Sequence, residues 1–317
     1  MVAFGALLSE CLCKLFGIRA LLLIALFAAL FISTSAQGQQ DTKPACRLST
    51  GWESYRNILY VPNGSARQNL DVYVPVTSKV PLPLIVWIHG GGWTSGSKEQ
   101  CAALDWASRG YVVASINYRL SRRAKFPAQI EDCKAAVCWL RRHAERYRID
   151  PARVVAWGES AGGHLASLMG TAGYVPEWEE GDEGGSSRVQ AVIDWYGRAD
   201  LTPVSTDPAL ANSASALLLG GSGEAVTELA QEASPILHVS KDDPPFLIMH
   251  GDRDNIVPLN QSERFANALR TVGVRVKMLV LKGAGHGGPE FMQAEPVKAI
   301  ETFLDEALSP YKTANLP

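Results

Sequence analysis

The stretch RVVAWGESAGG, residues 153–163, decides the fold of this chain. Its apolar half, Arg153–Trp157, predicts a buried strand, and a G-x-S-x-G pattern follows at the point where a helix begins. A serine on such a tight turn is displayed at the carboxyl end of a parallel sheet, above a helix N-terminus that favours developing negative charge. The glycines two residues to either side relieve crowding at a strained backbone. Ser160 is therefore the candidate nucleophile.

Outward from this stretch, strand-like and helix-like patterns alternate. Apolar runs rich in valine, isoleucine and aromatic residues predict strands at 57–61, 70–74, 84–89, 111–117, 153–157, 189–195, 246–250 and 276–281. Helical spacing predicts helices at 98–109, 128–147, 160–171, 261–271 and 294–307. The first two strands flank Asn63-Gly64, which favours a hairpin. A hairpin followed by this alternation predicts an α/β protein: one domain, 37–317, on a doubly wound, mostly parallel eight-stranded sheet.

One region interrupts the alternation. About fifty residues separate the strand ending at Trp195 from the strand that begins at Phe246, which is long for a simple crossover. The segment is rich in proline, serine, glycine and alanine, with a helical piece near Leu210–Leu219. We interpret residues 198–240 as an inserted cap over the site. The alternative is a surface excursion with no contact to substrate.

The N-terminus predicts export. Lys14 and Arg19 precede an apolar run, Ala20–Ile32, that is short for a bilayer span and has the length of a signal-peptide core. Thr34-Ser35-Ala36 fits a small-x-small cleavage site. We therefore expect a signal peptide at 1–36, cleavage after Ala36, and a secreted or periplasmic protein without a membrane span after cleavage. The alternative is an uncleaved membrane anchor.

Composition narrows the function classes. Hydrophobic residues make up 47% of the 317 residues and charged residues 20%, which is enough apolar material for a sizeable core. The net charge of −2, without a basic block, excludes nucleic acid as an expected partner. Beyond residue 36 the cysteines are Cys46, Cys101, Cys133 and Cys138. Their possible pairings all remain open, as do buried free thiols.

A second glycine-rich motif also follows a strong strand. His89-Gly90-Gly91-Gly92-Trp93 comes directly after Leu84–Ile88. A triple glycine lets successive backbone N–H groups turn inward, as the oxyanion of an acyl-transfer reaction requires. We predict Gly91 and Gly92 as oxyanion-hole donors, with the Ala161 N–H as the third. A phosphate loop is the alternative, but neither a Lys-Ser/Thr pair nor G-x-G-x-x-G spacing follows.

The general base follows from elimination among six histidines. On a sheet of this kind the chain order is serine, acid, histidine. The best acid candidates end the strand at 246–250, and His286 is the only histidine beyond them. It lies in a glycine-rich loop after the last strand, so we predict that it is the base. A histidine base predicts that activity falls as pH drops through the range in which imidazole titrates, about 6–7.

The acid comes from the stretch His250-Gly251-Asp252-Arg253-Asp254. Asp254 lies further into the loop and can reach toward His286, whereas Asp252 is placed to hold the turn by bonding nearby backbone N–H groups. We therefore predict Asp254 as the residue that orients the base, with Asp252 as the alternative. The motifs agree in order and in strand placement, and together they predict a Ser160–Asp254–His286 triad.

At these residues the chain resembles the α/β-hydrolase esterases. The motifs HGGGW, residues 89–93, and GESAGG, residues 158–163, are similar to the hormone-sensitive-lipase-related branch. The stretches SINYRLS, 115–121, and FPAQIEDC, 126–133, are similar to bacterial esterases grouped near feruloyl and acetyl-xylan esterases. The similarity covers most of the chain beyond residue 70. It implies the α/β-hydrolase fold, this triad and oxyanion hole, and neither cofactor nor metal. Because similar chains often carry cysteines at Cys101 and Cys133, it also suggests a bridge between these two.

The motifs predict a serine carboxylesterase that acts on short-chain esters through an acyl-enzyme. An exported enzyme would meet acetyl or feruloyl esters on extracellular polysaccharides, and small aliphatic esters are equally compatible with the motifs. Trp93, Tyr196 and Phe291 lie beside the motif loops and are candidates for substrate contact, with packing as the alternative. One rival is a serine peptidase of the prolyl-oligopeptidase type, for whose propeller domain this chain has no room. The other is a non-catalytic binding protein on a hydrolase scaffold, which the complete set of motifs disfavours.

Overall fold

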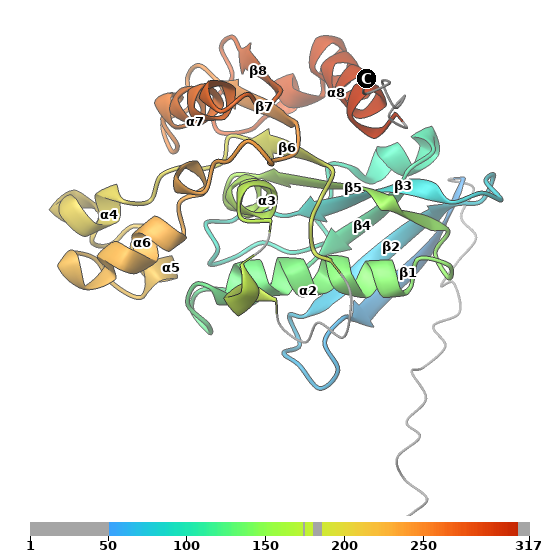
Figure 1. The fold of residues 1–317 in the computed structure, drawn as a ribbon, viewed down its shortest axis with the longest axis horizontal. Coiled ribbons are helices and arrows are strands. Elements are labelled where there is room, and N and C mark those ends of the chain that lie inside the picture. The colour runs from blue at the N-terminus through green and yellow to red at the C-terminus, as the bar shows by residue number, and fades with distance from the viewer. Residues whose placement is uncertain (1–50, 174, 180–185, 310–317) are drawn as a thin grey trace, which may run out of the picture. The chain divides into compact units, whose positions relative to one another are not determined.

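One eight-stranded sheet organises the chain in the computed structural model, which describes residues 51–173, 175–179 and 186–309 (Figure 1). The strands follow the order β1-β2-β4-β3-β5-β6-β7-β8. Their bounds are β1 Trp52–Leu59, β2 Asn69–Pro75, β3 Leu82–Ile88, β4 Val112–Ile116, β5 Ile149–Glu159, β6 Ala191–Trp195, β7 Phe246–Gly251 and β8 Val276–Leu281. β2 pairs antiparallel with β1 and β4, and the remaining neighbours are parallel. The predicted doubly wound, mostly parallel eight-stranded sheet is confirmed.

Helices cover both faces of this sheet. The helices α2 Ala128–Arg142, α3 Ala161–Thr171 and α7 Asn260–Thr271 contribute to the core on one face. The 3-10 helix η1 Leu104–Arg109 and the helix α8 Ala294–Leu308 contribute to the core on the other. The shorter helices are η2 Pro176–Trp178, α4 Pro203–Thr206, η3 Pro208–Leu210, α5 Ala214–Leu219, η4 Glu224–Val226, α6 Thr227–Glu232, η5 Pro235–Leu237 and η6 Pro289–Met292.

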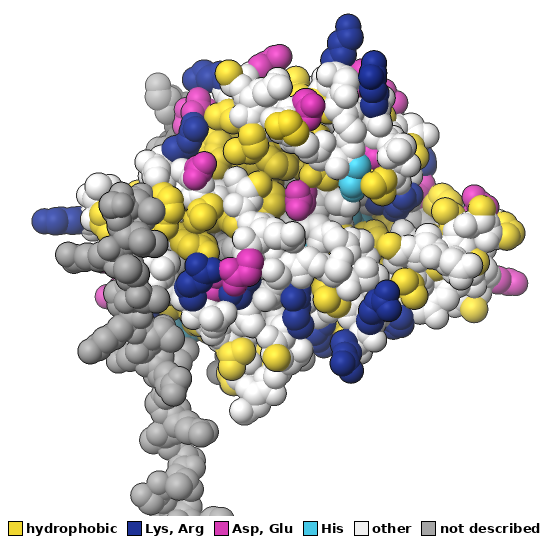
Figure 2. All heavy atoms as spheres, turned by 180° about the vertical axis from the view of Figure 1, so that it is seen from behind, with side chains coloured by type: hydrophobic (Ala, Val, Ile, Leu, Met, Phe, Trp, Pro, Cys, Tyr) yellow, Lys and Arg dark blue, Asp and Glu magenta, His cyan; other side chains and the backbone are white. Residues whose placement is uncertain are grey.

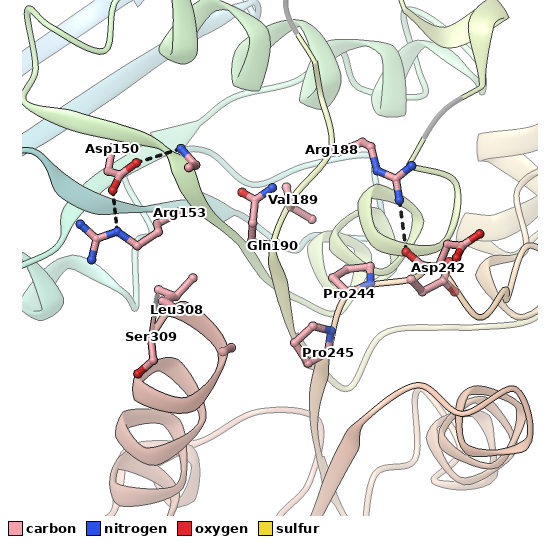
Figure 3. Close-up of a pocket in the computed structure, with 13 residues that line it drawn as sticks. Asp150, Arg153, Arg188, Val189, Gln190, Asp242, Pro244, Pro245, Leu308 and Ser309 are labelled. Carbon is pink, nitrogen blue, oxygen red and sulfur yellow. Dashed lines mark hydrogen bonds and ion pairs between the residues drawn. The ribbon is translucent and has the colours of Figure 1, made fainter. Parts of the chain in front are cut away.

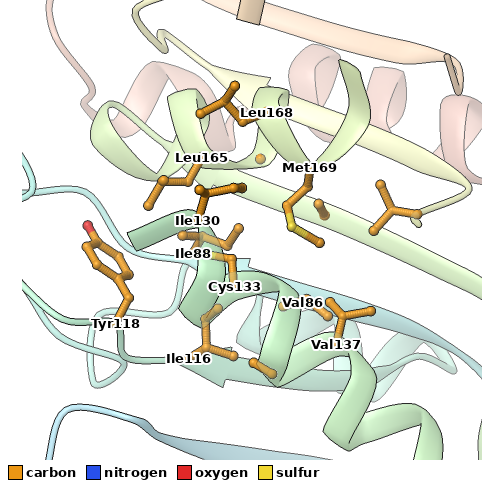
Figure 4. Close-up of a cluster of buried hydrophobic side chains, with 14 of the residues drawn as sticks. Val86, Ile88, Ile116, Tyr118, Ile130, Cys133, Val137, Leu165, Leu168 and Met169 are labelled. Atoms are coloured by element: carbon orange, nitrogen blue, oxygen red, sulfur yellow. The ribbon is translucent and has the colours of Figure 1, made fainter. Parts of the chain in front are cut away.

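Alternation along the central strands divides the side chains between the two cores. On β3, Val86 belongs to the core under α2 and α3, whereas its neighbour Trp87 belongs to the core under α8. In the first core, strand residues such as Val86 belong to one cluster with Val137 of α2 and Leu168 of α3 (Figure 4). Burying each such side chain contributes roughly 1.5–3 kcal/mol. Strands buried on both faces therefore read as the nearly continuous apolar runs seen in the sequence.

The second core contains a cluster of four tryptophans, in which Trp157 contacts the other three. Trp87, Trp106, Trp157 and Trp195 lie edge to face, with ring centroids 5.2–5.9 Å apart. Trp195 then contacts Phe291 at 5.3 Å. Within the described part of the chain, the indole N–H groups of Trp157 and Trp195 are buried without an acceptor. The cluster thus reaches from the middle of the sheet to its carboxyl edge.

The helix predicted at 98–109 is shorter in the structure, where only η1 forms. The Lys98 N–H donates to the Asn117 side chain at 2.8 Å, and the Lys98 carbonyl accepts from the Ser115 hydroxyl at 2.7 Å. Its ammonium group forms a buried ion pair with Asp71 at 2.7 Å. These bonds hold residue 98 to the strands, so helical hydrogen bonding begins only further along. The helix predicted at 128–147 similarly ends at Arg142.

The bridge suggested between Cys101 and Cys133 is wrong, because both cysteines are free thiols. Cys133 lies in the core under α2 and α3, whereas Cys101 packs against the core on the other face of the sheet. The sheet separates them. Cys138 is also a buried free thiol, which leaves Cys46 outside the described residues.

The segment predicted as a cap folds into short helices. From α4 to η5 these helices group beside the sheet, away from the large helices α2 and α8 (Figure 1). No helix in the described ranges is long and apolar enough to cross a membrane. The signal peptide predicted at 1–36 and its cleavage after Ala36 lie outside the described residues.

Candidate active site

The candidate nucleophile lies on a strained turn between β5 and α3. Ser160 has φ 51° and ψ −115°, a backbone conformation that L-residues rarely adopt. Its N–H donates to the Trp195 carbonyl on the neighbouring strand at 2.8 Å, which holds the turn against β6. A Cβ at Gly162 would collide with the backbone of Ile88, and one at Gly158 would collide with Gly162. The glycine spacing is therefore a steric requirement of the turn.

Ser160, His286 and Asp254 come together at the carboxyl edge of the sheet. The Ser160 hydroxyl lies 2.8 Å from Nε2 of His286, and Nδ1 of His286 lies 2.7 Å from Oδ2 of Asp254. The Asp254 side chain is fully buried, whereas His286 is 15% exposed. The three residues are thus bonded in the order that nucleophile, base and orienting acid require.

The loop after β7 binds the Asp254 carboxylate tightly. Oδ1 of Asp254 accepts the backbone N–H groups of Ile256 at 2.8 Å and Val257 at 2.9 Å. Burial alone would raise the pKa of Asp254, but the hydrogen bonds from His286 and from these two amides outweigh it and leave the pKa below its ordinary value. Asp252 instead accepts the Gly283 N–H at 2.6 Å, in the turn that joins the two loops.

His250, in β7, also supports the Asp254 carboxylate. Its Nε2 lies 2.9 Å from the Val257 carbonyl and 3.2 Å from Oδ2 of Asp254, and two acceptors require that this nitrogen carries the proton. Nδ1 then accepts from the Ser262 hydroxyl at 2.7 Å. Burial lowers the pKa of His250. A neutral, buried imidazole thus fixes the loop from which Asp254 projects.

The predicted oxyanion loop has the backbone that inward-turned amides need. Gly91 and Gly92 have φ values of 101° and 58°. A Cβ at Gly91 would collide with the Ser95 carbonyl. Within the described part of the chain, neither glycine amide has an acceptor. The Ala161 N–H opens α3, where the first-turn amides have no partner inside the helix. Three unused donors therefore surround the Ser160 turn.

Residues remote in sequence stiffen this loop. Nδ1 of His89 lies 2.7 Å from the Gly90 carbonyl, and Nε2 lies 3.0 Å from the Arg67 guanidinium. Tyr118 stacks on the His89 ring at 4.3 Å and donates its hydroxyl proton to the His89 carbonyl at 2.9 Å. Burial lowers the pKa of His89 to about 4, so the ring is neutral and accepts from Arg67. No sequence pattern at Arg67 or Tyr118 indicates that these side chains contact His89.

The three residues predicted to contact substrate are packing residues in this arrangement. Phe291 is 1% exposed, and Trp93 and Tyr196 are each 4% exposed. The Trp93 indole donates to Nδ1 of His164 at 3.2 Å. Phe291 lies between Trp195 and Tyr196. Little of their surface is left for a ligand, so their placement favours the packing alternative.

Tyr196 nevertheless contacts the triad. Its ring lies 4.7 Å from the His286 ring, at a 62° angle. Its hydroxyl donates to Glu159 at 2.9 Å. Its backbone has φ 45° and its N–H donates to the Met249 carbonyl at 2.9 Å. Burial, with the nearby Glu159 carboxylate, raises the pKa of Tyr196, so the phenol stays protonated. Glu159 and Tyr196 therefore form a wall beside the base.

The cap segment is tied to both motif loops. Nε2 of His164 on α3 lies 2.7 Å from the Ala233 carbonyl of the cap, while Nδ1 accepts from Trp93. Burial lowers the pKa of His164 to about 4. A Cβ at Gly92 would lie 3.2 Å from the Ala214 side chain of α5. The segment predicted as a cap thus adjoins the predicted oxyanion loop.

A cavity of about 760 Å³ lies elsewhere and is no part of this site. Its lining comes from the segments that precede β6 and β7, from the first half of β5, and from the end of α8 (Figure 3). These are the amino ends of the parallel strands, opposite to the triad. Both of its arginines are engaged: Arg153 pairs with Asp150 at 2.6 Å, and Arg188 donates to the Asp242 backbone carbonyl at 3.2 Å. Among the described residues, no group of His, Cys, Asp and Glu could hold a metal ion.

The chain is similar to known proteins in sequence and in fold. Esterase LipC of Mycobacterium tuberculosis is 36% identical over 73% of this chain and 59% of its own length. A truncated carbohydrate esterase from gut microbiota superposes with a TM-score of 0.75 at 32% identity, covering 83% of this chain and 99% of that one. Propionate-bound esterase Est2 of Thermogutta terrifontis superposes with a TM-score of 0.66 at 29% identity, covering 83% of this chain and 98% of that one. The chain spans 45–59% of the length of three curated relatives.

The fold, the bonded triad and these relatives define an α/β-hydrolase of the esterase class. The chain belongs to the BD-FAE family, whose profile matches residues 70–269. The resemblance predicted from the HGGGW and GESAGG motifs is thereby confirmed.

Proposed function

We propose that the protein is a serine carboxylesterase, exported after signal cleavage, that hydrolyses short acyl esters carried by polysaccharides. The observation that carries the proposal is the continuous hydrogen-bonded chain from Ser160 through His286 to Asp254, next to three unengaged amides. The sequence relative that is named an esterase supports ester hydrolysis as the reaction. The solved structure that is titled a carbohydrate esterase supports a polysaccharide as the carrier of the ester. The apolar run before residue 36 supports export.

The mechanism follows from the distances. His286 Nε2 takes the proton from the Ser160 hydroxyl as its oxygen attacks the ester carbonyl. The N–H groups of Gly91, Gly92 and Ala161 receive the negative charge that develops on the carbonyl oxygen. The imidazolium, held by Asp254, then gives its proton to the departing alcohol. A water molecule, deprotonated by the same nitrogen, releases the acid and restores Ser160.

A small acyl group fits the surroundings of the triad. The rings of Trp93, Tyr196 and Phe291 are buried and fill the space beside the motif loops. The Ala214 side chain of α5 lies next to Gly92, where an added Cβ would be 3.2 Å from it. A long chain would have to displace packed side chains, and we therefore expect acetyl and propionyl esters to react faster than decanoyl esters.

The test is hydrolysis of p-nitrophenyl acetate through decanoate by the wild type and by Ser160→Ala. We expect activity that is highest on the short esters and falls at least about 10³-fold in the variant. Acetate release from acetylated xylan then tests the polysaccharide, and its absence beside normal p-nitrophenyl acetate hydrolysis would restrict the substrate to small esters. Full activity in Ser160→Ala would refute the mechanism.

A further inference from the structure

Three exposed cations gather on the turn between β4 and α2. Arg122, Arg123 and Lys125, here called the basic turn, are all exposed, and none of them forms an ion pair within the described ranges. The charged neighbours differ in this respect, since Arg119 pairs with Asp132 at 2.8 Å and Lys98 pairs with Asp71. Like charges this close repel one another, and an anionic ligand is the partner that relieves the repulsion.

The backbone beneath the basic turn is fixed. The N–H groups of Arg123 and Ala124 both donate to the Leu120 carbonyl, at 2.8 and 3.1 Å. The buried Gln129 side chain donates to the carbonyls of Arg119 and Ala124, each at 2.8 Å. The cations therefore project from a rigid base, which lowers the entropic cost of holding a ligand.

This base is bonded to the loop that follows Gly92 and to α5 of the segment predicted as a cap. The Ser121 N–H donates to the Trp93 carbonyl at 2.8 Å, one residue beyond the oxyanion donor Gly92. The Lys125 ammonium donates to the Leu217 carbonyl of α5 at 2.8 Å. Figure 2 shows basic side chains gathered on the lower part of a face that also exposes a histidine.

We propose that the basic turn binds the carboxylates of an acidic polysaccharide, so that the preferred substrates are esters on uronate-containing chains. This inference rests on the proposed esterase function and names its substrate class. An anionic membrane is the less suitable partner, because interfacial binding needs a broad apolar surface. Of the exposed large hydrophobic residues, only Leu217 belongs to the turn or to α5.

The test compares two acetylated polymers that differ in charge alone. Acetylated polygalacturonate is one, and the same polymer with its carboxyl groups reduced to alcohols is the other. We expect the wild type to release acetate from the anionic polymer with about tenfold higher kcat/KM at low salt. The preference should vanish in the triple variant Arg122→Gln, Arg123→Gln, Lys125→Gln. It should also vanish in 1 M salt, where the screening length is about 3 Å.

A matched control removes the same charge elsewhere. The variant Arg270→Gln, Arg275→Gln, Lys277→Gln alters exposed cations at the end of α7 and the start of β8, and should keep the preference. All proteins should hydrolyse p-nitrophenyl acetate alike, because that ester is neutral and small. Equal rates on both polymers, or a preference that survives in the basic-turn variant, would overturn the inference.

Binding separates this inference from the esterase proposal. Retention of wild type, but not of the basic-turn variant, in gels containing unesterified polygalacturonate requires no catalysis. Retention without hydrolysis of any ester would reject the esterase and leave the polyanion surface standing. Binding to phosphatidylglycerol vesicles without retention by polygalacturonate would instead assign the turn to a membrane and reject the polysaccharide.

Discussion

The loop after β7 and the loop after β8 each contribute one member of the triad, but they hold it differently. Asp254 is bound by the amides of its own loop and by His250 beneath it. His286 lies in a loop with glycines at 283, 285, 287 and 288, and among the described residues its side chain forms hydrogen bonds only with Ser160 and Asp254. The acid is positioned by its own loop, whereas the base is positioned from outside.

Truncating the two residues gives the largest expected effects. We expect His286→Ala and Asp254→Ala each to lower kcat by about 10⁴-fold or more. Only Asp254→Ala should also lower the free energy of unfolding, by about 3 kcal/mol, because it leaves buried N–H donors without an acceptor. Ester hydrolysis and urea unfolding measure the two effects. Equal losses of stability would contradict the comparison.

Stability should fall in acid because buried histidines stay neutral in the fold. Burial lowers the pKa of His89 and His164 to about 4, and lowers that of His250. The unfolded chain binds protons near pH 6.5, so stability is lost as pH falls from there toward 4, by about 3 kcal/mol for each of the first two. Burial raises the pKa of Asp194 to about 6. The folded protein therefore binds this proton at a higher pH than the unfolded chain does, which adds stability as pH falls and opposes part of the loss. Urea unfolding between pH 8 and 4 tests this, and His164→Gln should flatten the slope. A stability that is constant over this range would contradict it.

His250→Phe should loosen the acid loop while leaving the catalytic residues in place. The variant loses the donor to Val257 and Asp254 and leaves the Ser262 hydroxyl without its acceptor. We expect a loss of about 2 kcal/mol of stability and a fall in kcat with little change in KM. His250→Asn, which can still donate, should recover part of both. A variant as stable and active as the wild type would show that Asp254 needs no support.

Tyr196→Phe should give the smallest effect. It keeps the ring beside His286 but removes the hydrogen bond to Glu159, and we expect kcat to fall about fivefold with KM unchanged. Glu159→Gln retains an acceptor for Tyr196 and serves as the control. If Tyr196→Phe changed KM alone, the wall would contact substrate and would not position the base.

The sequence predicted the parts of this site that local chemistry determines. The glycines around Ser160 mark a turn that only glycine permits, and chain order left one histidine for the base. The supporting residues were missed because they meet only in the folded chain. Arg67 reaches His89 across 22 positions, and Glu159 reaches Tyr196 across 37. No local pattern distinguishes such an arginine or glutamate from a solvated one.

The errors have the same origin. The cysteine bridge failed because residues 101 and 133 lie on opposite faces of the sheet, which spacing along the chain does not reveal. The helix predicted at 98–109 forms only from Leu104, because the backbone and the side chain of Lys98 both bond to the strand region. Tertiary contacts outweighed local preference in both cases.

The tryptophan cluster gives the enzyme a built-in optical reporter. Excitation passes readily between rings at 5–6 Å. The backbone carbonyl of the last tryptophan, Trp195, accepts the N–H of Ser160, and its ring contacts Phe291, which in turn packs against Tyr196 beside His286. In the proposed mechanism, acylation of Ser160 would therefore take place beside the last tryptophan of this cluster. Ultraviolet emission from the unlabelled protein should follow formation and decay of the acyl-enzyme in real time.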